Sequence, residues 1–229
     1  MSTAASSRPR ARGRGESAGL DLRQILDAAR TLDPDALTMQ AVADVLNVNR
    51  KALNHHVKDR ATLLGIVALD AFSAGFSSAE VSAAEDWRSA CRIYAVSFTE
   101  AVAGAGDLAA HLWFGDALTS WFLDPTEALF AKFDAAGFSG ELTTRLVALL
   151  SSMCLAHARD VTQATHTTGR PRANALRTAL DGVDVNDYEN LARISALGVD
   201  TYDRAQLDLT IDVFLTGAEA MRLREASAG

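Results

Sequence analysis

Cationic and amide side chains suited to holding a polyanion gather in residues 49–60. They are Asn49, Arg50, Lys51, Asn54, His55, Lys58 and Arg60. Arginine can pair two donors with a guanine edge, asparagine can pair with an adenine edge, and both side chains also bind phosphate. No Asp or Glu occurs from Val45 through Lys58, as expected of a surface that faces phosphate groups. This segment therefore favours nucleic-acid contact.

The charge of the whole chain supports a local basic surface. The formal net charge is −7, yet residues 1–60 carry ten Lys or Arg against seven Asp or Glu, whereas the rest carries 12 against 22. A basic head on an acidic body indicates that only the head faces a polyanion.

Residues 1–19 consist mainly of Ser, Ala, Gly, Arg and Pro, without apolar periodicity. We predict a flexible basic arm. Arg8, Arg10, Arg12 and Arg14 alternate with other residues, and an extended arm of this kind can enter a DNA minor groove. A solvated tail is the alternative.

The elements that must position residues 49–60 are three helices and the start of a fourth. Apolar residues at helical spacing predict a helix from 22 to 32, and Asp21 with Gln24 resembles a capping box. A second helix is expected over 39–46, with Thr38 as its N-cap. Asn47 tolerates the left-handed conformation that a tight turn requires.

A third helix is expected to follow Asn49, its cap, and to run to Val57. Asp59 is expected to cap a fourth helix from Arg60 to about residue 76. Two short helices joined by a tight turn and flanked by longer helices form a helix-turn-helix module.

The remainder of the chain is expected to be helical, because strand-type alternation is not sustained and Gly and Pro separate the periodic segments. The expected helices are 85–103, 107–122, 125–136, 139–166, 172–181, 187–197 and 202–225. The predicted fold class is all-α.

Two of these helices, 139–166 and 202–225, carry more apolar surface than one buried face needs. In the second, Leu207, Ile211 and Phe214 form one face, and Leu209 and Val213 form another. We expect a homodimer through a four-helix interface of these helices that includes Ile211 and Phe214. A central helix in a monomer is the alternative.

A small-molecule site is expected around the aromatic-rich stretch 111–122, because ligand cavities combine apolar walls with a few polar groups. The candidate ligand-binding residues are Phe98, His111, Trp113, Phe114, Asp116, Trp121, Met153 and His157. Ordinary core packing is the alternative.

Signatures of catalysis are absent from the sequence. It contains no GxSxG motif, no phosphate-binding glycine loop and no HxxH or HExxH pair, so we expect no enzyme activity, no cofactor and no metal. The two cysteines, Cys91 and Cys154, are far apart and suit a reducing compartment. Without a signal peptide or an apolar run of about 20 residues, a cytoplasmic location is expected.

Residues 37–64 resemble the TetR family of bacterial transcriptional regulators. The match lies in Leu37-Thr38, Val42-Ala43, Leu46-Asn47-Val48, Leu53, His56-Val57-Lys58 and Leu63-Leu64. The chain departs from the family pattern at Met39, at Asn47 in place of Gly and at Asn54 in place of Tyr. Asn54 is expected to read an adenine edge or to contact phosphate.

The resemblance implies a homodimer whose N-terminal helix-turn-helix binds a palindromic DNA operator. Its domains would be a basic arm (1–19), a DNA-binding domain (20–66) and a domain for effector binding and dimerisation (67–229). Thr38 and Gln40 join residues 49–60 as expected DNA contacts.

The expected function is that of a ligand-responsive repressor released from its operator by a small molecule. An effector-independent DNA-binding protein and a helical enzyme or interaction module are the alternatives.

Overall fold

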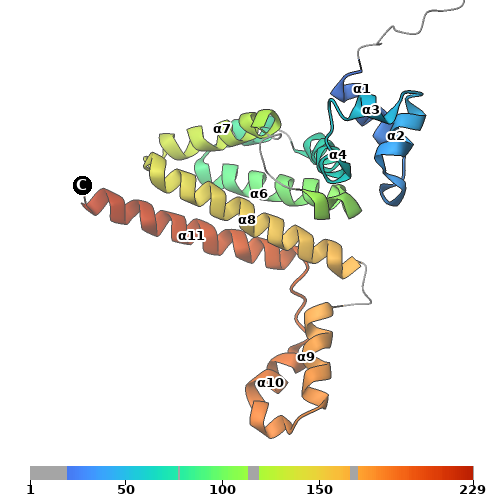
Figure 1. Cartoon of the computed structure of the whole chain (residues 1–229). Helices are drawn as coiled ribbons and strands as arrows, with labels where there is room; N and C mark the ends of the chain where they lie inside the picture. Colours follow the sequence, from blue (N-terminus) through green and yellow to red (C-terminus); the bar gives the residue numbers. More distant parts are fainter. Residues whose placement is uncertain (1–19, 77, 113–118, 166–169, 229) are drawn as a thin grey trace, which may run out of the picture. The chain divides into compact units, whose positions relative to one another are not determined.

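The computed structural model describes residues 20–76, 78–112, 119–165 and 170–228 (Figure 1). Within these ranges the ordered elements are all helical and no strand occurs, which confirms the predicted all-α class. The chain divides into two compact units, Met1–Leu63 and Leu64–Gly229.

The smaller unit is built from short helices around a small apolar core. It contains α1 (Leu22–Ala29), the 3-10 turn η1 (Pro34–Ala36), α2 (Met39–Val45), α3 (Arg50–Leu53) and the first residues of α4 (Arg60–Gly75). Its core side chains are at most 6% exposed, and they include Ile25, Leu26, Leu37, Val42, Leu53 and Val57. A core this small buries little apolar surface, so the helix caps supply a larger share of the stability of this unit.

The predicted caps of these helices are confirmed. Asp21 and Gln24 form a reciprocal capping box on α1. The Thr38 hydroxyl accepts from the Ala41 amide at 3.1 Å, and the Asn49 side chain accepts from the Lys51 amide at 2.9 Å. The Asp59 carboxylate accepts from the Thr62 amide at 2.8 Å at the start of α4. Each cap satisfies an amide that the helix itself leaves unpaired.

The larger unit continues with the rest of α4 and seven further α-helices. These are α5 (Ser78–Ala83), α6 (Trp87–Gly104), α7 (Thr119–Ala135), α8 (Gly140–Thr165), α9 (Pro171–Asp181), α10 (Glu189–Leu197) and α11 (Arg204–Ala228). The 3-10 segments η2 (Gly106–His111) and η4 (Val185–Tyr188) lie between them. Helix α6 packs against α5, α7, α8 and α11, so it is the central element of this unit.

Aromatic rings fill the core around α6. Phe98 lies 5.2 Å from Phe72 and 5.8 Å from Phe76, centroid to centroid, and both pairs meet edge to face. Trp87 and Phe133 pack with Phe138 at 4.9 and 4.8 Å. Edge-to-face pairs add about 1 kcal/mol each beyond the burial of their area, so these rings fix the position of α6.

The segment after α6 differs from the prediction of a helix over 107–122. A 3-10 helix ends at His111, Leu112 is extended, and α7 begins at Thr119. Helix α7 then continues through Pro125, where the sequence predicts a helix boundary. Pro125 is buried, so packing of its ring offsets the hydrogen bond that a proline cannot donate.

Helices α8 and α11 pack side by side, and the segment containing α9, η4 and α10 connects the end of α8 to the start of α11 (Figure 1). None of the described helices is long and apolar enough to cross a membrane.

Candidate nucleic-acid interface

The turn between α2 and α3 brings the two helices close together. Asn47 adopts the left-handed conformation with φ of 53°, as predicted, and is the one described non-glycine residue with positive φ. The Val48 amide then donates to the carbonyl of Ala43 at 3.0 Å. Ala43 is fully buried, and its small side chain permits the close approach. The α2–α3 pair therefore has helix-turn-helix geometry.

Helix α3 is shorter than predicted, because its regular part ends at Leu53 and not at Val57. The carbonyl of Leu53 accepts from the amides of both His56 and Val57 at 2.8 Å, so a tightened turn replaces the last helical residues. Leu53 and Val57 are both fully buried and hold this turn against the core.

The cationic and polar side chains predicted to bind DNA lie on the outside of this motif. Arg50, Lys51, Asn54, His55 and Lys58 are all exposed. Within the part of the chain that the structure describes, their side chains make no hydrogen bond or ion pair. A row of exposed donors without internal partners is available to phosphates and base edges.

The other residues predicted to contact DNA also make hydrogen bonds within the smaller unit. Thr38 caps α2, and Gln40 donates from Nε2 to the Asp44 carboxylate at 2.8 Å. Arg60 donates from Nε to the carbonyl of Leu37 at 2.9 Å. Arg60 thus ties α4 to the segment before α2, a role that the sequence pattern did not reveal because the partner is a backbone carbonyl 23 residues away. The arm residues Arg10, Arg12 and Arg14 lie outside the described residues.

Asp59 lies between two cations at the start of α4. Hydrogen bonds from the amide and hydroxyl of Thr62 lower the pKa of Asp59, and Lys58 adds to the effect. This carboxylate therefore stays ionised as a helix cap, and the adjacent Lys58 stays free to face solvent.

The predicted ligand-binding residues fall into different surroundings. Phe98 is fully buried in the aromatic core, and Met153 packs partly buried against the same core. His111 lies exposed on η2, whereas His157 is buried on α8. Trp113, Phe114, Asp116 and the side chain of Trp121 lie outside the described residues.

Burial lowers the pKa of His157, and Asp160 and Asp203 oppose that shift. Burial also raises the pKa of Tyr94 to about 12. The Tyr94 hydroxyl lies 3.0 Å from the Ser151 hydroxyl of α8. The Tyr94–Ser151 contact therefore joins α6 to α8, and burial favours the neutral forms of Tyr94 and His157.

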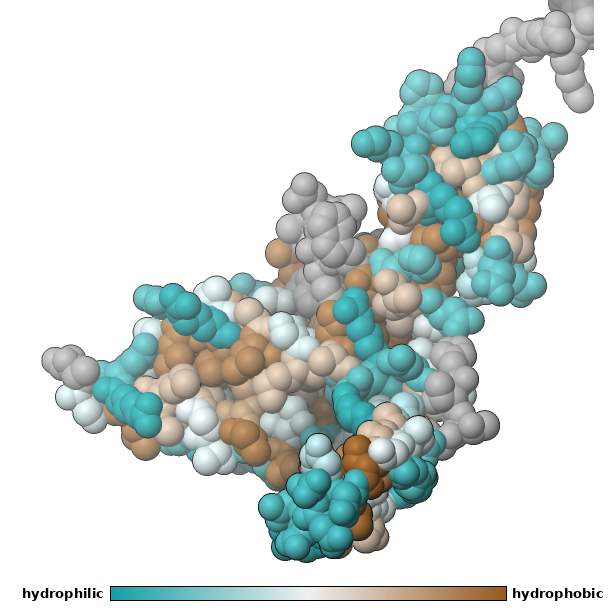
Figure 2. Space-filling model, turned by 60° about the horizontal axis from the view of Figure 1, so that its bottom comes forward, coloured by the Kyte–Doolittle hydropathy of each residue, from teal (hydrophilic) through white to brown (hydrophobic). Residues whose placement is uncertain are grey.

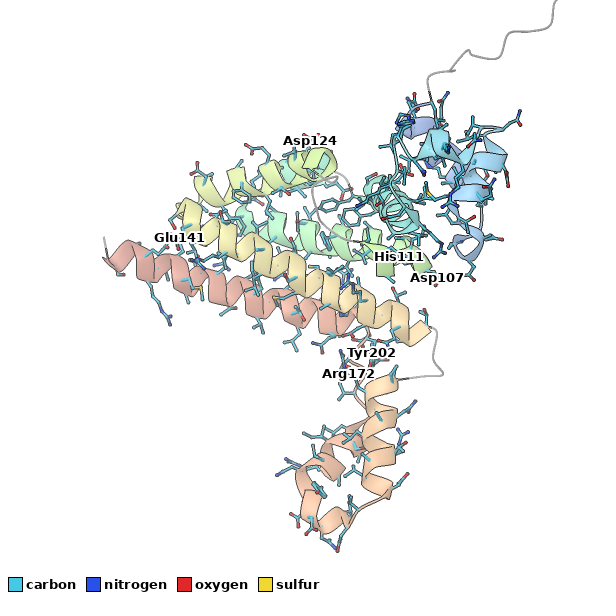
Figure 3. All side chains as sticks on the ribbon, in the orientation of Figure 1. Asp107, His111, Asp124, Glu141, Arg172 and Tyr202 are labelled. Carbon is cyan, nitrogen blue, oxygen red and sulfur yellow. The ribbon has the colours of Figure 1, made fainter. Side chains whose placement is uncertain are left out.

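A cavity of about 480 Å³ opens to solvent between η2 and the end of α8. Its lining residues are Gly106, Asp107, Ala109, Ala110, Arg159, Thr162 and Gln163. Arg159 also donates to the carbonyl of Leu112 at 3.3 Å. Asp107 projects from η2 beside His111 (Figure 3). The predicted ligand-binding set contains none of these lining residues. The prediction started from a stretch rich in aromatic residues, whereas the lining residues are small or polar.

The prediction that Ile211 and Phe214 of α11 lie in a dimer interface is wrong. Ile211 and Phe214 are 1% and 4% exposed and belong to the core of their own unit. Leu209 and Val213 are 57% and 61% exposed, because positions two residues away on a helix point to the opposite side. The large apolar side chains that are exposed on α8 and α11 are Leu149, Leu209, Val213, Met221 and Leu223.

No family model matches the sequence, and no curated protein is significantly similar to it. Solved structures do match. The TetR family protein ActR of Streptomyces coelicolor, in complex with actinorhodin, has a TM-score of 0.70 at 23% identity, over 89% of this chain and 97% of that one.

Two further structures have the same architecture. The transcriptional regulator SCO7222 of Streptomyces coelicolor, a TetR, has a TM-score of 0.64 at 23% identity, over 89% of this chain and 99% of its own. A TetR variant of Acinetobacter baumannii AYE, in complex with minocycline, has a TM-score of 0.61 at 18% identity, over 89% and 98% of the two chains. The chain therefore has the fold of TetR family regulators.

Proposed function

We propose that this protein is a member of the TetR family, a transcriptional repressor that binds a palindromic operator as a homodimer and is released by a small molecule. The observation that carries the proposal is the α2–α3 motif. Its buried side holds the motif in a compact unit, and its exposed side presents Arg50, Lys51, Asn54 and His55 without internal partners among the described residues. These are the side chains that read base edges and bind phosphate.

The smaller and the larger part of the chain would have different functions. Residues 20–66 would bind DNA, and residues 67–229 would bind the effector and form the dimer. Exposed Leu149, Leu209 and Val213 on α8 and α11 suit the apolar centre of a four-helix interface with a second copy. A two-fold dimer places its two motifs on equivalent half-sites, which is why the operator would be palindromic.

The cavity between η2 and α8 supports effector binding. Its volume of about 480 Å³ lies in the range typical of small-molecule sites. Two structures of the same fold hold actinorhodin and minocycline, both of which are small molecules. An effector releases DNA only to the extent that it binds the released conformation more tightly than the DNA-bound one.

The DNA-binding part is tested by selection of duplexes from a random pool, followed by affinity measurement on the selected sequence. The variant Arg50→Ala/Lys51→Ala should lose about 30-fold or more in affinity for that duplex, as two specific contacts of about 1–3 kcal/mol each imply, and keep its helical content. Arg145→Ala/Arg204→Ala is the matched control, because it removes the same charge from exposed arginines of the larger unit. Selection of no preferred sequence, or equal losses in both variants, would refute the proposal.

The effector part is tested separately on the operator complex. Actinorhodin and minocycline are the first probes, and release of DNA at micromolar concentration is the expected result for a ligand of this class. Arg159→Ala should weaken the effect of a releasing compound without changing operator affinity in its absence. DNA binding that no tested compound changes, with no ligand that raises Tm, would favour an effector-independent regulator.

A further inference from the structure

The cavity between η2 and α8 has two walls of different chemistry. Arg159, Thr162 and Gln163 line it from α8, and their spacing of three and four residues places them on one face of that helix. The wall formed by η2 contributes small side chains and one carboxylate, from Gly106, Ala109, Ala110 and Asp107. Apart from Asp107, the polar side chains that could orient a ligand therefore lie on α8.

Arg159 is the only cation among these lining residues, and its guanidinium is already held in place. It donates from Nη2 to the carbonyl of Leu112 at 3.3 Å, and Leu112 itself is 2% exposed. Arginine carries five N–H donors, so this bond leaves most of them for another acceptor. A guanidinium that is held in position loses less conformational entropy when it binds a ligand.

Arg159 also lacks the carboxylate partner that most arginines of the larger unit have. It forms no ion pair with any residue that the structure describes, and its hydrogen-bond partner is a neutral carbonyl. Asp160, the next residue along α8, pairs instead with Arg172 of α9. The other arginines of this unit that pair with a carboxylate are Arg88, Arg92, Arg145, Arg170, Arg204 and Arg222. Arg159 therefore brings a positive charge to the cavity that no described carboxylate pairs with.

The lining of the cavity suits a polar ligand better than a purely apolar one. Figure 2 shows groups of hydrophobic residues on the face of the larger unit that it presents. The cavity lining differs from such surface, because it contains a guanidinium, a carboxylate, a hydroxyl and an amide. The Thr162 hydroxyl donates to the carbonyl of Ala158 at 2.9 Å, so its proton is already used and Arg159 remains the charged donor of the cavity.

We propose that the effector is an organic acid that is ionised at neutral pH, and that its oxyanion binds the guanidinium of Arg159 while its body lies against the small side chains of η2. A carboxylate can accept two parallel N–H bonds from one guanidinium. Asp107 on the η2 wall repels an anion, so the acidic group binds on the α8 side. The proposal rests on the proposed function, which assigns this cavity to the effector, and it adds the charge class of the ligand.

The test measures binding to the full chain without DNA, by calorimetry, for pairs of compounds that differ in charge and hardly in shape. The probes are benzoate, 2-naphthoate and anthraquinone-2-carboxylate, each compared with its neutral carboxamide. At least one acid should bind, about tenfold or more tightly than its amide, because only the acid forms charge-assisted hydrogen bonds. Equal affinity of acid and amide, or binding of no acid at millimolar concentration, would overturn the proposal.

Substitution of Arg159 identifies the group that recognises the acid. Arg159→Gln removes the charge and keeps an amide donor for the carbonyl of Leu112, so it should weaken acid binding about tenfold or more and leave amide binding within about twofold. Arg145→Gln is the matched control, because Arg145 is an exposed arginine of the same helix, and it should change neither. Unchanged acid binding in Arg159→Gln, or an equal loss for acid and amide, contradicts the assignment.

Asp107→Asn should act in the opposite direction. It removes a negative charge from the cavity lining, so it should strengthen acid binding and leave amide binding unchanged. Weaker acid binding in this variant would place the acidic group elsewhere and refute the site.

Duplex selection separates this proposal from the proposed function. Acids that bind through Arg159 to a protein with no preferred duplex would refute the repressor and leave the anion site standing. A selected operator that only neutral compounds release would refute the acidic effector and leave the repressor standing.

Discussion

The side chain of Arg60 donates from Nε to the backbone carbonyl of Leu37 at 2.9 Å, which joins the start of α4 to the residue before the Thr38 cap of α2. Leu37 itself is 1% exposed. The arginine at the start of α4 therefore helps to hold the helix-turn-helix motif together in addition to any contact with phosphate.

We expect Arg60→Ala to lower the free energy of unfolding by about 1 kcal/mol, the typical net value of one hydrogen bond, and also to weaken DNA binding. Lys58→Ala is the matched comparison, because the Lys58 side chain is exposed and donates no hydrogen bond to a carbonyl within the described residues. It should weaken DNA binding with no change in Tm. Thermal unfolding and duplex affinity of both variants check this, and equal Tm values in the two variants would argue against the structural role.

The left-handed turn residue gives a second prediction. Asn47 has φ of 53°, where a Cβ without a compensating side-chain interaction costs about 1 kcal/mol or more. Asn47→Ala should therefore be destabilising by about 1 kcal/mol, and Asn47→Gly should equal or exceed the wild type in stability. Chemical denaturation of the three proteins gives the order, and an alanine variant as stable as the glycine variant would contradict the assigned turn.

The smaller unit can be predicted from sequence because its structure is set by local rules. Residue type and spacing alone identify Asp21, Thr38, Asn49 and Asp59 as caps, and each accepts the expected amide. The same reasoning places Asn47 in the left-handed turn. These features depend on neighbours within a few residues, which a sequence displays directly.

The larger unit is less predictable because its faces are chosen by distant partners. The period of α11 identifies two apolar faces, but only packing on α6 and α8 decides that Ile211 and Phe214 are inside and Leu209 and Val213 are outside. Helix α7 continues through Pro125 for a similar reason. Burial of the proline ring offsets the missing hydrogen bond, although proline by itself predicts a helix boundary. The cavity residues between η2 and α8 form no recognisable pattern in the sequence.

The two faces of α11 yield a third prediction. Val213→Asp changes a side chain that is 61% exposed and should give a folded protein with the mass of a monomer. Ile211→Asp places a carboxylate where a side chain is 1% exposed and should cost about 3 kcal/mol or more in stability. Light scattering and circular dichroism separate these outcomes, and a dimeric Val213→Asp variant would exclude this face from the interface.

A fourth prediction concerns stability in acid. Burial lowers the pKa of His157 below its ordinary value of 6.5, although Asp160 and Asp203 oppose the shift and Arg172 reinforces it. The unfolded chain then takes up a proton before the folded chain does, so the stability contributed by neutral His157 is complete above pH 6.5 and is lost as the pH falls below it. His157→Gln should show a smaller drop in Tm than the wild type when the pH is lowered from about 7.5 to about 5.5, on either side of the ordinary histidine pKa. Identical drops would contradict this assignment.

The basic arm provides the last prediction, through the salt dependence of DNA binding. Residues 1–15 include Arg8, Arg10, Arg12 and Arg14, and each cation that neutralises a phosphate adds about 0.9 to the slope of log K against log salt concentration. Deletion of residues 1–15 should therefore weaken operator binding and flatten this slope by roughly one for each phosphate that the arm neutralises in the wild-type complex. Arg8→Gln/Arg10→Gln/Arg12→Gln/Arg14→Gln is the matched control, because it keeps the length of the arm and removes only its charge. If the arm enters the minor groove, both proteins should show the same flattened slope, whereas an unchanged slope in both would show that the arm is a solvated tail.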